Sequence, residues 1–126
     1  MAPMAGAVLY VKNIAKVSTF YLNVAELAVV GFEDGYIVLE SPSFQLVLVA
    51  IPEEIAVNIE ISSPPTRRED TPVKLIFYVS SISVARTAAL QFGGELSPMD
   101  REWTFRGHRV CDGLDPEGNV IQFREV

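Results

Sequence analysis

The chain contains one histidine and one cysteine, and the two lie three positions apart as His108 and Cys111. An imidazole beside a thiol can act as a base and nucleophile pair, and both groups are ligands for transition metals. The surrounding residues are typical of a strand, in which side chains three positions apart point to opposite faces of the sheet. A nucleophile pair would therefore require a bend, and no further histidine or cysteine could complete a metal site. We expect a strand or surface histidine and a small buried thiol, and we predict no catalytic residue.

A glutamine lies in the last apolar stretch of the chain, GLDPEGNVIQFRE. The DPEGN segment before it is typical of a tight turn, because proline pre-sets one central position and glycine or asparagine tolerates a positive φ. The residues that follow alternate as in a strand with two different faces, one carrying Ile121 and Phe123 and the other Val120, Gln122 and Arg124. The half-polar second face must lie against water or a cavity.

A repeat organises the whole chain. The stretch VLYVKNI, residues 8–14, matches IFYVSSI, residues 76–82, so that Tyr10 aligns with Tyr78. Each copy continues into an amphipathic helical pattern after a possible capping residue, which is Asn13 in the first copy and Ser80 or Ser81 in the second. The sequence therefore predicts a strand followed by a helix at two places in the chain.

Three strand-like segments follow each predicted helix. They are VVGFE, YIVLE and FQLVLVAI in the first half, and ELSPMDREWTF, HRVCDGL and NVIQFREV in the second half. Each half is thus a predicted βαβββ module, with module one at about residues 5–51, a crossing linker at about 52–71 and module two at about 72–126. Because neither half could bury its sheet alone, we expect residues 1–126 to form a single α+β domain.

Charge and composition bear on possible partners. The formal net charge of −6 argues against nucleic acid, whose phosphates such a surface would repel. No apolar run is long enough to span a bilayer, and the N-terminal segment lacks the features of a signal peptide. A single cysteine cannot form an internal disulfide, which fits a reducing compartment. We expect a cytoplasmic protein without membrane or nucleic-acid partners, and we interpret RRED, residues 67–70, as a solvated loop.

Two tandem βαβββ modules, a helix opening like VKNIAKVSTFY and a final hairpin DPEGNVIQF resemble the glyoxalase / bleomycin-resistance / extradiol-dioxygenase superfamily, the vicinal oxygen chelate fold. The resemblance covers nearly the whole chain. It implies four strands per module, which form curved, incomplete barrel sheets around a cavity. Short two-module members are usually homodimers that build paired cavities from both chains. The fold hosts lyases, isomerases, dioxygenases, thiol transferases and drug-binding proteins, so it does not by itself indicate an activity.

The enzymes of this superfamily hold a divalent metal through His, Glu or Gln side chains on the first and last strands of each module. Carried over by position, the first-strand sites fall on Gly6 and Lys74, and the last-strand sites on Val47 or Leu48 and on Gln122. Glycine and aliphatic side chains offer no donor atom, and lysine brings a positive charge. Hard divalent metals require several oxygen or imidazole ligands. We therefore predict no metal ligand and no cofactor.

The resemblance also implies that the first-strand position faces the cavity, together with its i+2 and i+4 neighbours. The cavity-facing residues would then be Gly6, Val8 and Tyr10, with Lys74, Ile76 and Tyr78 opposite them and Val120, Gln122 and Arg124 from the last strand. Each polar or aromatic member also has an ordinary explanation, as a sheet aromatic or as a charge that reaches water. Trp103, in DREWTF, is either a core residue or a stacking wall. The predicted ligand-binding residues are Tyr10, Lys74, Tyr78, Trp103, Gln122 and Arg124.

Aromatic walls with a few placed polar groups are typical of small-molecule pockets. We therefore expect a metal-free binding protein of the drug-sequestration kind, a homodimer whose ligand is planar or aromatic. Lys74 and Arg124 favour carboxylate, phenolate or quinone-like oxygens, and Gln122 would orient the ligand by hydrogen bonding. One alternative is a metal-dependent lyase, isomerase or dioxygenase whose ligands lie elsewhere in the sequence. Another is a structural or regulatory module whose cavity is filled by its own side chains.

Overall fold

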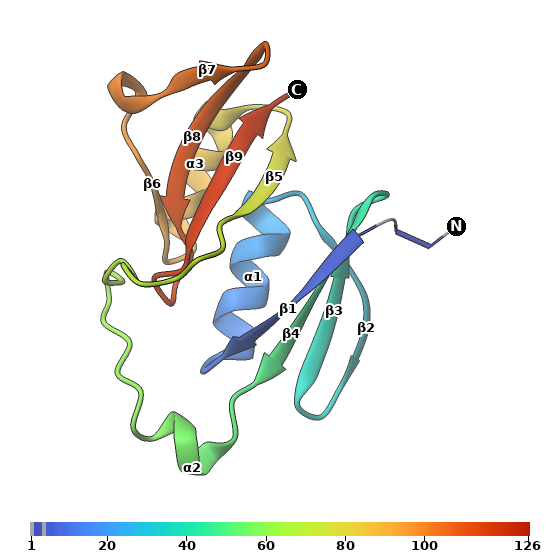
Figure 1. Ribbon diagram of the computed structural model, residues 1–126. Helices are drawn as coiled ribbons and strands as arrows, with labels where there is room; N and C mark the ends of the chain where they lie inside the picture. The colour runs from blue at the N-terminus through green and yellow to red at the C-terminus, as the bar shows by residue number, and fades with distance from the viewer. Residues whose placement is uncertain (1, 4) are drawn as a thin grey trace.

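The first module is a four-stranded sheet that carries one helix (Figure 1). The computed structural model describes residues 2–3 and 5–126. The elements of this module are β1 (Ala5–Val11), α1 (Ile14–Val24), β2 (Ala28–Glu33), β3 (Tyr36–Glu40) and β4 (Phe44–Ala50). The strand order is β1-β4-β3-β2, with β1 parallel to β4 and antiparallel pairing between the other neighbours. This is the predicted βαβββ arrangement.

The second module repeats this plan with one interruption. Its elements are β5 (Leu75–Val79), α3 (Ile82–Gln91), β6 (Glu95–Leu96), β7 (Trp103–Phe105), β8 (His108–Leu114) and β9 (Val120–Glu125). The segment ELSPMDREWTF, expected as one strand, is divided into β6 and β7 by a 3-10 turn over Met99–Arg101. Pro98 has no N–H for a strand ladder, and its carbonyl accepts from the N–H of Arg101 at 2.9 Å. Both short strands pair with β8, so the sheet has five strands instead of the expected four.

The linker between the modules contains one short helix, α2 (Glu53–Ala56), and then runs to β5 without further regular structure. The interpretation of RRED as a solvated loop is right for Arg67 and Glu69, which form an exposed ion pair at 3.7 Å. It is wrong for Arg68, whose backbone N–H donates to the carbonyl of Gly118 at 3.0 Å and whose Nε donates to that of Glu117 at 3.1 Å. Within the described residues, no helix is long and apolar enough to cross a membrane.

Each long helix begins at a capping side chain. Asn13 accepts from the N–H of Lys16 at 3.0 Å and begins α1. Ser81 accepts from the N–H of Val84 at 3.2 Å and begins α3, so Ser81 and not Ser80 is the cap of the second module. Helix α3 stops before Gly93, which takes a positive φ of 92° that a residue with a side chain adopts at a cost.

The two helices share one hydrophobic core with the inner faces of both sheets. Helix α1 contacts β3 and β4, α3 contacts β6 and β9, and the two helices contact each other. Aromatic rings connect the modules, since the Tyr21 ring lies 5.4 Å from that of Phe77, which in turn lies 6.1 Å from Phe123. Among residues 2–3 and 5–126, no helix covers the opposite face of either sheet. We call it the open face.

Two glutamate carboxylates, one buried (Glu117) and one exposed (Glu26), join the modules in a reciprocal way. Glu117, in the DPEGN turn of module two, accepts from the backbone N–H groups of Lys12 and Asn13 at 2.9 and 2.7 Å. Glu26, in module one, accepts from the backbone N–H of Ser80 at 2.8 Å, at the position that the repeat aligns with Lys12. Each module thereby supplies the acceptor for the strand-to-helix junction of the other. In the same turn, buried Asp115 accepts from the hydroxyl of Tyr21 at 2.7 Å.

Replacing Tyr21 with phenylalanine should lower the free energy of unfolding at pH 7 by about 1–3 kcal/mol, because Asp115 loses a buried donor. Burial, reinforced by Asp115, raises the pKa of Tyr21 well above 10.0. A raised folded-state pKa contributes stability that is present below pH 10 and is lost as pH rises toward the folded value. The difference between wild type and Tyr21→Phe should therefore shrink above pH 10. Urea denaturation from pH 7 to 11 measures this difference in the free energy of unfolding, and Tyr36→Phe, at an exposed tyrosine, is the control. The prediction would be contradicted if the free energies of wild type and Tyr21→Phe changed in parallel with pH.

Candidate functional site

The open face of the second sheet gathers four of the predicted ligand-binding residues. Cross-strand pairing aligns Gln122 with Ile76 of β5, and Arg124 with Tyr78. Arg124 also faces Val110 of β8, which pairs with Trp103 of β7. Since directly paired residues point to the same side of a sheet, Tyr78, Trp103, Gln122 and Arg124 share one face.

A continuous set of hydrogen bonds connects the polar residues of this face. The ammonium of Lys74, just before β5, lies 3.0 Å from Oδ2 of Asp112. The Gln122 amide donates from Nε2 to Oδ1 of Asp112 at 3.1 Å and accepts at Oε1 from Nε of Arg124 at 2.9 Å. Arg124 also donates from an Nη to the hydroxyl of Tyr78 at 3.4 Å. The contacts therefore form one continuous series from Lys74 through Asp112, Gln122 and Arg124 to Tyr78.

Two residues of this set were missed by sequence reasoning. Asp112 lies between Lys74 and Gln122, and it could have been found by counting back from the DPEGN turn, since the hairpin register pairs residue 112 with 122. Phe105 places its ring centre 4.9 Å from the Arg124 guanidinium, and the Tyr78 ring lies 5.9 Å from the same group. Phe105 was missed because ELSPMDREWTF was expected as one strand, whereas a 3-10 turn divides it and β7 pairs with β8 directly after Arg106 and Gly107.

Exposure separates the floor of the site from its walls. Gln122 is only 6% exposed, whereas Tyr78 is 49% exposed and Trp103 42%. Both ends of the Gln122 amide are already bonded within the protein, so this residue positions Asp112 and Arg124 from below. The groups that reach solvent are the aromatic rings and the two cations. A ligand on this face would therefore meet Tyr78 and Trp103 at the sides and Arg124 and Lys74 in the middle.

Tyr10 lies apart from this set, on the open face of the first sheet. It pairs with Val49 of β4, which in turn pairs with Tyr36 of β3. Tyr10 is 62% exposed and its neighbour Val8 is 57% exposed. The open face of the first sheet is mainly aliphatic and aromatic, whereas the open face of the second sheet is cationic and aromatic.

The positions that hold a metal in the superfamily do not suit one in this chain. The strand register places Val47 opposite Val8 as it places Gln122 opposite Ile76, so Val47 and not the buried Leu48 is the equivalent position. At Gly6, an added Cβ would lie 2.7 Å from the Gln45 carbonyl oxygen, which leaves no room for a ligating side chain. Lys74 brings an ammonium that is already paired with Asp112. Residues 2–3 and 5–126 also contain no group of three or more His, Cys, Asp or Glu that could hold a metal ion.

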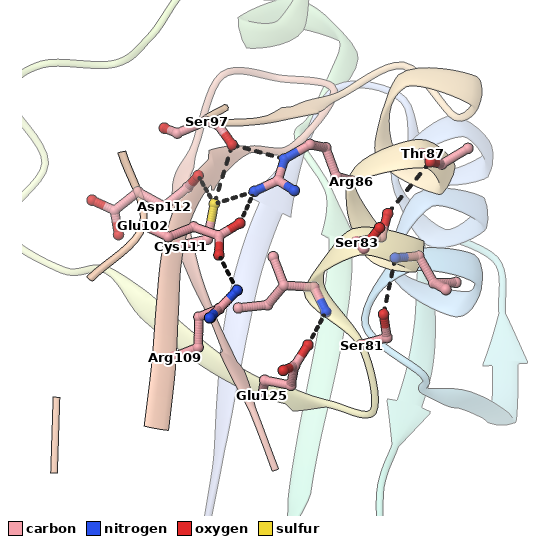
Figure 2. A network of polar contacts seen from close by, with 12 residues as sticks. Ser81, Ser83, Arg86, Thr87, Ser97, Glu102, Arg109, Cys111, Asp112 and Glu125 are labelled. Atoms are coloured by element: carbon pink, nitrogen blue, oxygen red, sulfur yellow. Dashed lines mark hydrogen bonds and ion pairs between the residues drawn. The ribbon is translucent and has the colours of Figure 1, made fainter. Parts of the chain in front are cut away.

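The histidine and the cysteine lie on opposite faces of β8, as expected. His108 pairs with Phe105 on the open face, and its Nδ1 lies 2.9 Å from the carbonyl oxygen of Glu125, so Nδ1 must be the donor. Cys111 is buried on the helix side, where its thiol donates to the Ser97 carbonyl at 3.3 Å (Figure 2). Burial raises the pKa of Cys111, although nearby Arg86 opposes the shift. The thiol is therefore a structural group.

Solved structures match this chain over nearly its whole length, whereas no family model and no curated protein matches it. A glyoxalase/bleomycin resistance protein/dioxygenase family enzyme from Burkholderia phytofirmans PsJN is 18% identical, with 99% of each chain covered and a TM-score of 0.69. An integron cassette protein from the mobile metagenome of V. cholerae is 21% identical, with 99% of this chain and 95% of its own covered and a TM-score of 0.65.

A third similar structure is a bleomycin resistance determinant encoded on the transposon Tn5. It is 12% identical, with 98% of each chain covered and a TM-score of 0.63. These likenesses lie in the backbone and not in the sequence. The chain has the fold of the glyoxalase/bleomycin-resistance/dioxygenase superfamily, the vicinal oxygen chelate fold.

Proposed function

We propose that the protein binds a planar, anionic small molecule on the open face of its second sheet, without a metal ion, in a cavity that a second copy of the chain completes. The observation that carries this proposal is the bonded set from Lys74 through Asp112 and Gln122 to Arg124, flanked by exposed aromatic rings. Flat ligands fit aromatic walls, and a cation near a ring adds attraction for a conjugated anion.

Arg124 supports an anionic ligand more strongly than Lys74 does. Lys74 is paired with Asp112, but no carboxylate of the described residues lies within ion-pair distance of Arg124. Its guanidinium is held by Gln122 and by the rings of Tyr78 and Phe105, so little side-chain freedom is lost when a ligand binds. A planar guanidinium is suited to a carboxylate or a phenolate oxygen.

The proposed second copy accounts for the exposed apolar residues of the first sheet. Val8, Tyr10 and Tyr36 form an open face that water covers in the single chain. Exposed apolar clusters of this kind mark interaction surfaces in soluble proteins. If the first sheet of one copy faces the second sheet of the other, Tyr10 becomes a wall opposite Tyr78 and Trp103. The likeness to a bleomycin resistance determinant favours sequestration of a ligand over its chemical conversion.

Protein purified without chelators should contain no stoichiometric divalent metal. The physical reason is the donor set, since Gly6 and Val47 supply no ligand atom and Lys74 supplies a positive charge. Elemental analysis measures the content, and addition of nickel, zinc, iron or manganese should leave the melting temperature unchanged. A bound metal at the depth of Gln122 would contradict this prediction and favour a metal-dependent lyase, isomerase or dioxygenase.

In solution the protein should have twice the chain mass of 13.9 kDa, as measured by light scattering at micromolar concentration. Val8→Asp places a charge in the proposed interface and should give the mass of a single chain. The matched control is Val84→Asp, on the exposed side of α3, which should remain a dimer. A wild-type monomer, or equal behaviour of the two variants, would count against the proposed interface.

Planar aromatic acids and quinones should quench or shift the fluorescence of Trp103, the single tryptophan. Arg124→Gln should weaken their binding because it removes the unpaired cation. Gln122→Leu should weaken binding by about 1–3 kcal/mol, because Asp112 and Arg124 each lose a buried partner. Trp103→Phe removes the signal, so its binding is measured by calorimetry. Arg101→Gln, on the exposed 3-10 turn, is the control for lost charge.

Two outcomes would overturn the assignment of this site to a planar anion. The first is that neutral aliphatic compounds bind as well as planar anions do. The second is that Gln122→Leu and Arg124→Gln bind the planar anions as tightly as the Arg101→Gln control.

A further inference from the structure

A cavity of about 770 Å³ lies beneath the linker, away from the open faces of both sheets. Figure 1 shows the linker, in green, leaving the first sheet after β4 and returning to β5 by a wide path past one end of α1. Linker residues 59–62 and 66–68 line the cavity on one side, and Lys12 and the DPEGN turn line it on the other. An adjoining cavity of about 430 Å³ shares Lys12 and Glu117 and adds Lys16 of α1.

Cations gather in this region of an acidic chain. Four of the ten lysine and arginine residues line the two cavities, and they are Lys12, Lys16, Arg67 and Arg68. The only acidic residues in either lining are Glu60 and Glu117. Glu117 is 4% exposed, and both of its carboxylate oxygens accept backbone N–H groups at the start of α1. Its lone pairs are therefore committed to the fold, and the cations dominate the accessible wall.

Two of these cations are held in place by the protein itself. Arg68 is bound to the DPEGN turn through its backbone N–H and its Nε. In the described part of the chain, its two terminal guanidinium nitrogens make no hydrogen bond, although Arg68 lines the cavity. The ammonium of Lys12 donates to the carbonyl of Ile59, which keeps it at the cavity wall with donor capacity to spare.

We propose that this cavity is a second binding site, which takes a small organic anion with a phosphate or carboxylate head group. The guanidinium of Arg68 and the ammonium of Lys12 would hold the head group, because charge-assisted hydrogen bonds to oxyanions are strong. Ile59 and Ile61 supply an apolar wall for the rest of the molecule. The volume is in the range of small-molecule sites and exceeds what an inorganic ion needs. None of these residues belongs to the planar-ligand site, so the two proposals stand or fall separately.

The test is a calorimetric titration of the full chain with pyrophosphate and with citrate, at low and at physiological salt. The two probes separate phosphate from carboxylate recognition. Arg67→Gln/Arg68→Gln should weaken the preferred probe at least about tenfold, the effect of losing a charge-assisted hydrogen bond. The matched control is Arg101→Gln/Arg106→Gln, which removes the same charge from exposed positions and should change binding less than twofold. Lys74→Met, in the planar-ligand site, should leave this binding unchanged.

A second measurement keeps the proposal testable if the double variant fails to fold. Amide spectra of isotope-labelled wild type, titrated with the same probes, should shift at residues 59–68 and not at residues 76–78 or 122–124. The proposal is overturned if neither probe binds at millimolar concentration, or if the shifts fall on the second sheet. Equal weakening by the two double variants would also overturn it, since it would indicate a general effect of net charge.

Discussion

The buried carboxylates of the DPEGN turn hold the two modules in their relative position. Glu117 accepts the N–H groups of Lys12 and Asn13, where β1 passes into α1, and Asp115 accepts from Tyr21 on the buried face of that helix. A buried carboxylate without donors is costly, so both groups stabilise the fold only while the hairpin and α1 remain in register. The same hairpin carries Asp112, Gln122 and Arg124. The turn that joins the modules therefore belongs to the same hairpin as the candidate site.

The electrostatics of the chain differ from what its net charge of −6 suggests. Lysine and arginine residues gather in two regions, one on the open face of the second sheet and one in the cavity beneath the linker. Lys74 is paired with Asp112, but Arg124, Lys12 and Arg68 are held by neutral carbonyl or amide oxygens, so their positive charge is not neutralised by these contacts. Local positive potential of this kind attracts small anions even when the net charge of the chain is negative.

The sequence was sufficient for the fold because each module follows local rules. Alternation predicted the strands, capping residues the helix starts and the repeat the two modules, whereas the arrangement of the strands in sheets was implied by the family resemblance. The division of one predicted strand by Pro98 was missed because pairing of both fragments with β8 is a tertiary effect. The predicted site was only partly assembled. Four of its residues share a sheet face and Lys74 joins them through Asp112, but Tyr10 lies on the other sheet.

Three features of the two proposed sites lay outside the reach of sequence reasoning. The Phe105 ring lies near Arg124 because the three-residue strand β7 pairs with β8. The hydrophobic periodicity of the sequence does not indicate this pairing. Both ends of the Gln122 amide are hydrogen-bonded within the protein because its Nε2 is the end that donates to Asp112, and the sequence does not indicate this orientation. The anchoring of Arg68 on the DPEGN turn joins segments far apart in the chain, and a charged loop sequence gives no sign of it.

The crowding at Gly6 has an evolutionary consequence. A mutation to histidine at this position would press its Cβ against the β4 backbone, with a steric penalty and no metal to offset it. The metal would bind well only after Val47 and Lys74 had also been replaced. An intermediate that carries only the substitution at Gly6 would therefore be less stable than its parent without a bound metal. Selection acting on one substitution at a time would therefore oppose the appearance of a metal centre at this position, even though the chain has the vicinal oxygen chelate fold.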